Sequence, residues 1–219
     1  MGSTIAAIAK ANVGLGACST NSEGGTAYET SCDGNSGQPE YWCADFVQWV
    51  WQEAGVDTSD LDAAAGSFYL YGQANGTFHT TPAIGDAAVF NYGGGGVAEH
   101  VAIVVDVQPD GTIETVSGDW NGTGSTEAEF SSTSQVVLNV PAYPGVTGTS
   151  PAIMGMTISA FVSPLAKGSG GESGAPACIV STTGEEGTCI DSGTCASMGG
   201  TSTPGYCPGP ASEECCTGI

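Results

Sequence analysis

The sequence EYWCADFVQWVW, residues 40–51, decides how the chain is expected to fold. It predicts a helix that begins at or just before Cys43. Unpaired backbone N–H groups at a helix start favour the thiolate form of a cysteine. Cys43 therefore stands where a nucleophilic thiol would be placed, although a buried or disulfide-bonded cysteine fits this stretch equally well. The helix prediction rests on apolar residues at the spacing of one helical face, followed by a glycine stop: Phe46, Val47, Val50, Trp51, Ala54 and Gly55.

The chain of 219 residues is strongly acidic, with a formal net charge of −21 and only two basic residues, Lys10 and Lys167. Binding of nucleic acid requires clustered Lys or Arg to neutralise phosphates, so nucleic acid is excluded as a partner. The same charge argues against docking on anionic membranes or teichoic acids. No apolar run approaches the ~20 residues of a membrane span, so membrane insertion is not expected.

Nine cysteines indicate an oxidising, extracellular setting. Cys18 and Cys32 lie in the polar loop before the predicted helix and are natural disulfide partners. The C-terminal segment, residues 178–219, contains six more cysteines but too few apolar residues to bury a core. Three disulfides are therefore expected in this tail. The adjacent Cys215 and Cys216 should bond to different partners. This pairing leaves Cys43 as the unpaired thiol.

We expect the protein to be secreted and monomeric. Its first residues, Met-Gly-Ser, resemble an expression start placed on a mature chain, and no signal peptide follows them. A precursor that carries a secretion signal is therefore predicted.

The remaining pattern predicts an α+β fold, with N-terminal helices packed on an antiparallel β-sheet, plus a small disulfide-stapled module. Further helices are expected at 4–14 and 58–74, and the period then changes to that of strands. We predict a catalytic domain at 4–165, a Gly/Ser linker at 166–177 and a six-cysteine module at 178–219. The predicted strands are 82–90, 100–107, 112–117, 135–140 and 157–162.

A nucleophilic thiol needs a base, and the chain offers only His79 and His100. His79 lies in a polar loop, where a solvated surface histidine is the more ordinary interpretation. His100 begins a strongly β-branched strand after a glycine-rich turn, so it is the preferred base. The following strand of the hairpin ends at Asp119, which could orient the imidazole, or could simply be a turn residue.

These residues resemble the cysteine/histidine-dependent amidohydrolase/peptidase (CHAP) domain, a family of the papain-like superfold related to NlpC-type enzymes. The resemblance rests on Trp42–Val47, on Pro82–Phe90 with its Gly-Asp pair, and on His100–Val104. It implies hydrolysis of amide bonds in peptidoglycan or muropeptides, as an endopeptidase or an N-acetylmuramoyl-L-alanine amidase.

Carried over to this sequence, the resemblance implies Cys43 as nucleophile, His100 as base and Asp119 as the orienting third residue. Many members of the family have Glu-x-Asn or Gly-Gly-Asn at the third site. Here the stretch is Ser117-Gly118-Asp119, which places Asp in the usual Asn position and Ser in the Glu position. Asn121 is an alternative polar residue, ranked below Asp119.

The resemblance implies no required cofactor, although some members bind calcium in the loop before the cysteine. Asp33, Asn35 and Asp45 could form such an oxygen-rich site, or the loop could be a plain turn. The tail vaguely resembles clip-like disulfide modules and contains no sign of chemistry.

Two other classes of function stay open. One is a catalytically silent module that binds the cell wall or a protein through the same groove. The other is a protease that acts on proteins.

Overall fold

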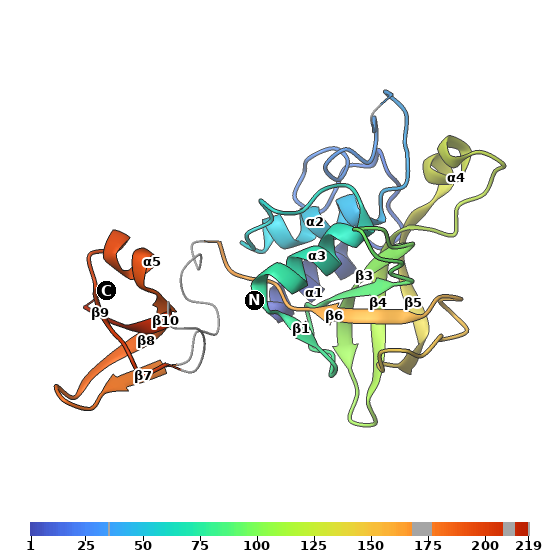
Figure 1. Ribbon diagram of the computed structural model, residues 1–219. Helices are drawn as coiled ribbons and strands as arrows, with labels where there is room; N and C mark the ends of the chain where they lie inside the picture. The colour runs from blue at the N-terminus through green and yellow to red at the C-terminus, as the bar shows by residue number, and fades with distance from the viewer. Residues whose placement is uncertain (35, 168–176, 208–212, 219) are drawn as a thin grey trace. The chain divides into compact units, whose positions relative to one another are not determined.

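The computed structural model describes residues 1–34, 36–167, 177–207 and 213–218. The chain forms two compact units, Met1–Lys167 and Gly168–Ile219 (Figure 1). Most of the predicted linker, residues 168–176, lies outside the described residues.

The first unit is built on a six-stranded antiparallel sheet with the order β1-β6-β2-β3-β4-β5. The last strand of this unit, β6, pairs with both β1 and β2 and therefore lies between them in the sheet. The strands are β1 (Phe78–His79), β2 (Ala87–Phe90), β3 (His100–Val107), β4 (Thr112–Trp120), β5 (Gln135–Pro144) and β6 (Ile158–Val162).

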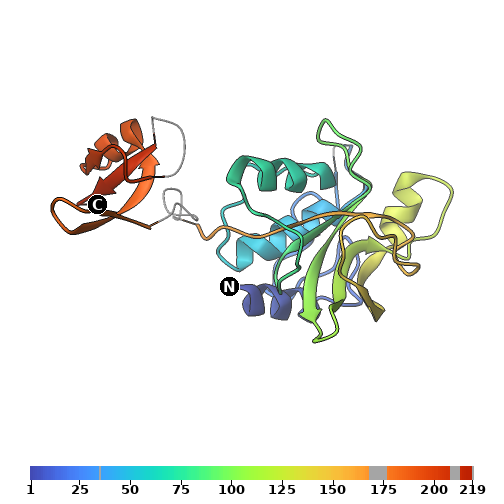
Figure 2. The same ribbon diagram turned by 60° about the horizontal axis from the view of Figure 1, so that its bottom comes forward.

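Three helices cover one face of this sheet (Figure 2). Strand β3 divides its side chains between the two faces, because successive residues of a strand point in opposite directions. Val101 and Ile103 pack with the helices, whereas Ala102 and Val104 join a second apolar cluster. The fold is therefore α+β and consistent with the papain-like arrangement, as predicted. The covering helices are α1 (Gly2–Ala11), α2 (Cys43–Glu53) and α3 (Ala65–Asn75).

Most of the predicted elements are confirmed, and the helix that begins at Cys43 and the strand 100–107 are found as expected. The helix predicted at 58–74 begins only at Ala65. The side chains of Asp57 and Asp62 accept hydrogen bonds from backbone N–H groups two residues later, which favours turns over a helix in this segment. The sequence analysis missed the short strand β1 and helix α4 (Glu127–Thr133).

The second unit has a four-stranded antiparallel sheet with the order β7-β8-β10-β9. Three disulfides stabilise this unit, as predicted, and Cys215 and Cys216 bond to different partners. The structure decides the pairing: Cys178–Cys215, Cys189–Cys207 and Cys195–Cys216. The fourth disulfide, Cys18–Cys32, lies in the first unit and is also confirmed. The elements of the second unit are β7 (Ala177–Val180), β8 (Glu185–Asp191), α5 (Ser192–Ser197), β9 (Thr201–Thr203) and β10 (Glu213–Thr217).

Helix α2 approaches β4 closely at Gly118. A Cβ atom built on this glycine would lie 2.5 Å from the Cβ of Phe46 and 3.0 Å from the ring of Trp42. Both side chains belong to the start of the helix, and both are fully buried. The absence of a side chain at this position therefore allows the N-terminal end of α2 to contact the sheet.

Replacement of Gly118 by Ala should destabilise the first unit by about 1–3 kcal/mol, because the added methyl group overpacks a filled contact. The change should be measured as a lowered midpoint of thermal or urea unfolding. Gly93→Ala is the matched control, since a Cβ there meets no atom within 4 Å. Equal stability of the two variants would contradict the role assigned to Gly118.

Candidate active site

The thiol of Cys43 is placed by the start of α2. Cys43 is the first residue of the helix and is only 6% exposed, and it is the free cysteine among the described residues. Its sulfur lies near the backbone N–H groups of Val101 and Ala44. Val101 directly follows His100 on β3, so the thiol lies beside the strand that carries the predicted base.

The imidazole of His100 is held among aromatic and polar side chains at the start of β3. Its ring lies 6.0 Å from the ring of Phe90 and 4.8 Å from that of Trp120. Its Nε2 is 2.9 Å from Oγ of Ser117. The histidine is 5% exposed, and burial lowers its pKa to about 3.

A cavity of about 180 Å³ joins the three predicted site residues. Cys43, His100 and Asp119 all line it, although they come from α2, β3 and β4. The remaining lining residues are Tyr41, Glu99, Trp120, Phe130 and Met156.

Asp119 does not make the contact that was predicted for it. The imidazole nitrogen Nε2 shares a hydrogen bond with Oγ of Ser117, while Asp119 accepts a 2.6 Å hydrogen bond from Oγ of Ser134. The pairing of β4 with β5 shifts register between Ser117 and Trp120, and Asp119 has a φ of 52°. This bulge interrupts the alternation of side chains along the strand, which explains why the carboxylate of Asp119 contacts Ser134 and not the imidazole.

The contacts of Asp119 instead stabilise the start of α2. Ser134 Oγ also accepts a hydrogen bond of 2.9 Å from the indole Nε1 of Trp42, the residue before Cys43. Burial raises the pKa of Asp119 to about 6, against the hydrogen bonds from Ser134 and from the backbone N–H of Trp42. The structure therefore connects Asp119 to the helix that carries the thiol.

Ser117 and Asn139 are polar neighbours of the imidazole that the sequence analysis did not assign. Oγ of Ser117 lies 2.8 Å from Oδ1 of Asn139 on the adjacent strand β5. The position of Ser117 was available from the family pattern, where glutamate is common. Asn139 had no signal in the sequence, because only the pairing of β4 with β5 brings it close.

A larger cavity of about 530 Å³ opens from the same cysteine. It shares Tyr41, Cys43 and Glu99 with the smaller cavity, so the two are adjacent. Its wall is formed largely by the segments before α3 and before β3. Four carboxylate side chains line it: Glu40, Asp62, Glu99 and Glu127.

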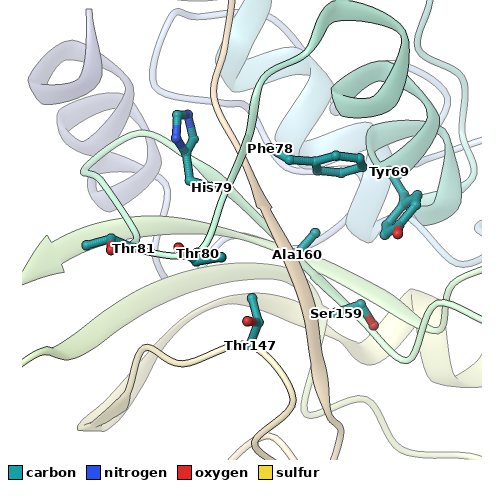
Figure 3. A pocket seen from close by; sticks show the side chains of 8 residues that line it. All are labelled: Tyr69, Phe78, His79, Thr80, Thr81, Thr147, Ser159 and Ala160. Carbon is teal, nitrogen blue, oxygen red and sulfur yellow. The ribbon is translucent and has the colours of Figure 1, made fainter.

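His79 lies apart from the thiol, on β1. Its Nε2 is 2.8 Å from Oγ of Ser163, which donates a 2.6 Å hydrogen bond to Asp86. The side chain is exposed beside a third cavity, of about 430 Å³, whose lining Figure 3 shows around the strand that carries Ser159 and Ala160. No cysteine lines this cavity.

Burial favours the neutral forms of both the thiol and the imidazole. Burial raises the pKa of Cys43 to about 12, and the carboxylates of Asp119 and Asp45 raise it further, against the nearby backbone N–H groups. This corrects the expectation of a lowered thiol pKa. A helix terminus contributes only ~0.3–2 kcal/mol, whereas removing an ion from water costs several kcal/mol.

The predicted calcium ligands are not gathered into a site by the described residues. Asp45 is 2% exposed, and its carboxylate accepts a 2.9 Å hydrogen bond from Thr30. Asn35 lies outside the described residues. Within the described ranges, the one group of His, Cys, Asp or Glu close enough to share a metal ion consists of Cys178, Cys189 and Cys207, all in disulfides. Calcium binding stays a prediction.

The fold and this cavity define a papain-like unit with a buried thiol beside an imidazole. Residues 33–119 match the CHAP domain, and the match includes Cys43, His100 and Asp119. This match agrees with the resemblance on which the sequence analysis relied. No curated protein and no solved structure matches the chain.

Alkylation of Cys43 by iodoacetamide should be slower at pH 7 than that of a free cysteine peptide, and it should accelerate steeply above pH 9. The physical reason is that burial keeps the thiol protonated, and the thiolate is the nucleophile. Mass spectrometry of the labelled protein measures the rate, with Cys43→Ala as the control. A rate that is already high and constant between pH 6 and 9 would instead indicate a preformed thiolate–imidazolium pair.

Asp45 should make the first unit less stable as the pH rises from about 4 to 7. Burial raises the pKa of this carboxyl to about 7, against the hydrogen bond from Thr30. The folded protein therefore retains a proton that the unfolded chain loses near pH 4, so the free energy of unfolding falls across this interval.

Asp45→Asn mimics the protonated form and should reduce this pH dependence in urea unfolding, with its largest gain over the wild type at pH 7.5. Thr30→Val removes the hydrogen bond that favours the charged form and should extend the loss of stability to higher pH. A pH profile of Asp45→Asn identical to that of the wild type would contradict the assignment.

Proposed function

We propose that the first unit is a thiol hydrolase that cleaves amide bonds of peptidoglycan with Cys43 and His100. The CHAP match indicates a hydrolase of the amidase or peptidase type that acts on peptidoglycan. The observation that carries the finer proposal is the shared cavity, into which a free thiol and an imidazole from separate elements both open.

The proposed reaction begins when Sγ of Cys43 attacks the carbonyl carbon of the amide while its proton passes to His100. Backbone N–H groups at the start of α2, including that of Cys43, receive the negative charge on the carbonyl oxygen. His100 then gives the proton to the departing amine as the C–N bond breaks, which leaves a thioester. Water, with its proton taken by His100, releases the carboxylic acid and restores the thiol.

The larger cavity supports a peptide that carries an amine as the substrate. Its four carboxylates face a solvent-accessible space next to the thiol, and the whole chain offers only two lysines as compensating charge. Such a surface attracts cationic groups and repels anionic ones. The stem and cross-bridge peptides of peptidoglycan can present free amines, which favours the endopeptidase over the amidase reaction.

The proposal extends to the setting of the protein. Four disulfides indicate an oxidising environment, which supports secretion. No helix in the described ranges is long and apolar enough to cross a membrane. The disulfide-linked second unit would serve as an accessory module, and we propose that the protein acts as a monomer.

Cys43→Ala and His100→Ala should each remove nearly all turnover of purified muropeptides, because the two groups act as one unit. Products identified by mass spectrometry would also show which amide bond is cleaved. His79→Ala is the matched control and should retain activity, since His79 lies beside a different cavity. If wild type and Cys43→Ala both bind muropeptides but neither cleaves them, the protein is a silent binding module and the hydrolase proposal is wrong.

Asp119→Asn should retain substantial turnover, because an amide oxygen can still accept the hydrogen bond from Ser134. Asp119→Ala should lower both turnover and thermal stability, because it removes the acceptor for Ser134, which holds Trp42 at the start of α2. Steady-state kinetics and thermal unfolding of the two variants test this assignment. Loss of activity in Asp119→Asn as complete as in Cys43→Ala would show that the negative charge itself is essential.

A further inference from the structure

The third cavity, at the β1–β6 edge of the sheet, takes no part in the proposed reaction. Its volume of about 430 Å³ lies in the range of ~300–1,000 Å³ that small-ligand sites occupy. Figure 3 shows two aromatic rings on one side of the strand that carries Ala160 and three threonines on the other side. The rings belong to Tyr69 and Phe78, and the threonines are Thr80, Thr81 and Thr147.

The aromatic side of the cavity is held in place by its neighbours. Phe78 is 37% exposed, and its ring lies 4.7 Å from that of Tyr69. Tyr69 in turn stacks on Tyr92 at 3.7 Å, with the two planes 7° apart. A Cβ atom built on Gly72 of α3 would lie 2.9 Å from the ring of Phe78, so this glycine allows the ring to rest against the helix. The rings are therefore positioned before a ligand arrives, and their faces attract C–H groups.

The opposite side of the cavity offers hydroxyl groups with unused hydrogen-bonding capacity. Within the part of the chain that the structure describes, the hydroxyls of Thr80, Thr81 and Thr147 have no hydrogen-bond partner. Oγ of Ser159, which also lines the cavity, accepts a 2.9 Å hydrogen bond from the N–H of Tyr92. Each hydroxyl can donate one hydrogen bond and accept two, so this wall can bind a ligand that carries many polar groups.

The charge of the cavity restricts the ligand further. None of the described residues that line it carries a carboxylate, ammonium or guanidinium group, although the chain has a formal net charge of −21. A charged ligand would lose its hydration without gaining an ion pair, and a purely apolar ligand would leave the hydroxyls unpaired. A neutral ring with an apolar face and a hydroxyl-rich edge matches both walls. This combination is the chemistry of a pyranose sugar.

His79 is not part of this binding surface, although it lies beside the cavity. On β1 it stands between Phe78 and Thr80, and successive side chains of a strand point to opposite sides. Figure 3 shows its imidazole directed away from the threonines, and its Nε2 lies 2.8 Å from Oγ of Ser163. Loss of this imidazole therefore leaves the aromatic and hydroxyl groups of the cavity in place.

Helix α3 connects this cavity to the larger cavity next to the thiol. Ala65 is the first residue of the helix and lines the larger cavity, and Tyr69 follows it by about one helical turn. A second connection is made by Tyr92, whose hydroxyl accepts a 3.1 Å hydrogen bond from the N–H of Gly96. Gly96 also lines the larger cavity. The two cavities are therefore neighbours, and one polymer with sugar and peptide parts can occupy both.

We propose that this third cavity binds a sugar of the peptidoglycan glycan strand while the attached peptide occupies the larger cavity. The inference deepens the proposed function and rests on it. Phe78 contacts the apolar face of the sugar ring, and the threonines bind its hydroxyl or acetamido groups. Because the site lies away from the thiol, it binds ground state and transition state alike, so it lowers KM and leaves kcat unchanged.

Calorimetric titration of the full chain with oligomers of N-acetylglucosamine tests the site directly, because this probe carries no peptide. We expect the wild type to bind. Phe78→Ala removes the aromatic face, and Thr80→Val removes one hydroxyl while keeping the shape of the side chain. Each should weaken binding on the order of 10-fold. Ile84→Ala is the matched control: Ile84 is 41% exposed and does not line the cavity, so this variant should keep the wild-type affinity.

Steady-state kinetics tests whether the sugar belongs to the substrate. Two substrates are compared, a muropeptide with its glycan attached and the same cross-linked peptide without sugar. Phe78→Ala should raise KM for the glycan-linked substrate on the order of 10-fold more than KM for the sugar-free peptide. A merely structural role of Phe78 would change the two values equally.

Absence of oligosaccharide binding to the wild type would overturn the proposal, and so would equal affinities of the wild type, Phe78→Ala and Thr80→Val. Weakened oligosaccharide binding with equal changes of KM for both substrates would show that the bound sugar is not that of the substrate, which also overturns it. If the wild type cleaves no muropeptide, the proposed function fails, whereas the titration still decides whether the cavity binds sugar.

Discussion

The contact between the start of α2 and Gly118 of β4 is the constraint on which the site depends. Only a residue without a side chain allows Phe46 and Trp42 to approach the strand so closely. Trp42 is then fixed through Ser134, which also binds Asp119. Because Cys43 directly follows Trp42, this packing determines where the thiol lies relative to the sheet. A larger residue at position 118 would displace the thiol together with its helix.

Burial favours the uncharged forms of the thiol and the imidazole. Desolvation raises the pKa of the thiol and lowers that of the imidazole. Four carboxylate side chains line the larger cavity next to the thiol.

Much of the site could be predicted from local patterns. The helix start at Cys43, the strand that begins at His100 and the hairpin that leads to Asp119 all depend on short-range periodicity and turn residues, and all three elements are present. Counting and clustering of the cysteines predicted the Cys18–Cys32 bridge and three bridges in the second unit, but not which of those six cysteines pair. Helix α3 began later than predicted, because turns formed by aspartate side chains competed with helical propensity.

The sequence by itself determined the class of fold, the elements that carry the thiol and the imidazole, and the cysteine that stays free. The tertiary structure alone decided the partners of these groups. A bulge after Ser117 moves Asp119 from the imidazole to the start of α2, and strand pairing brings Asn139 to Ser117. Neither effect has a local signature, because a bulge and a cross-strand contact depend on residues that are far apart in the sequence. Desolvation of the thiol is likewise a property of the packed core and not of the helix that carries it.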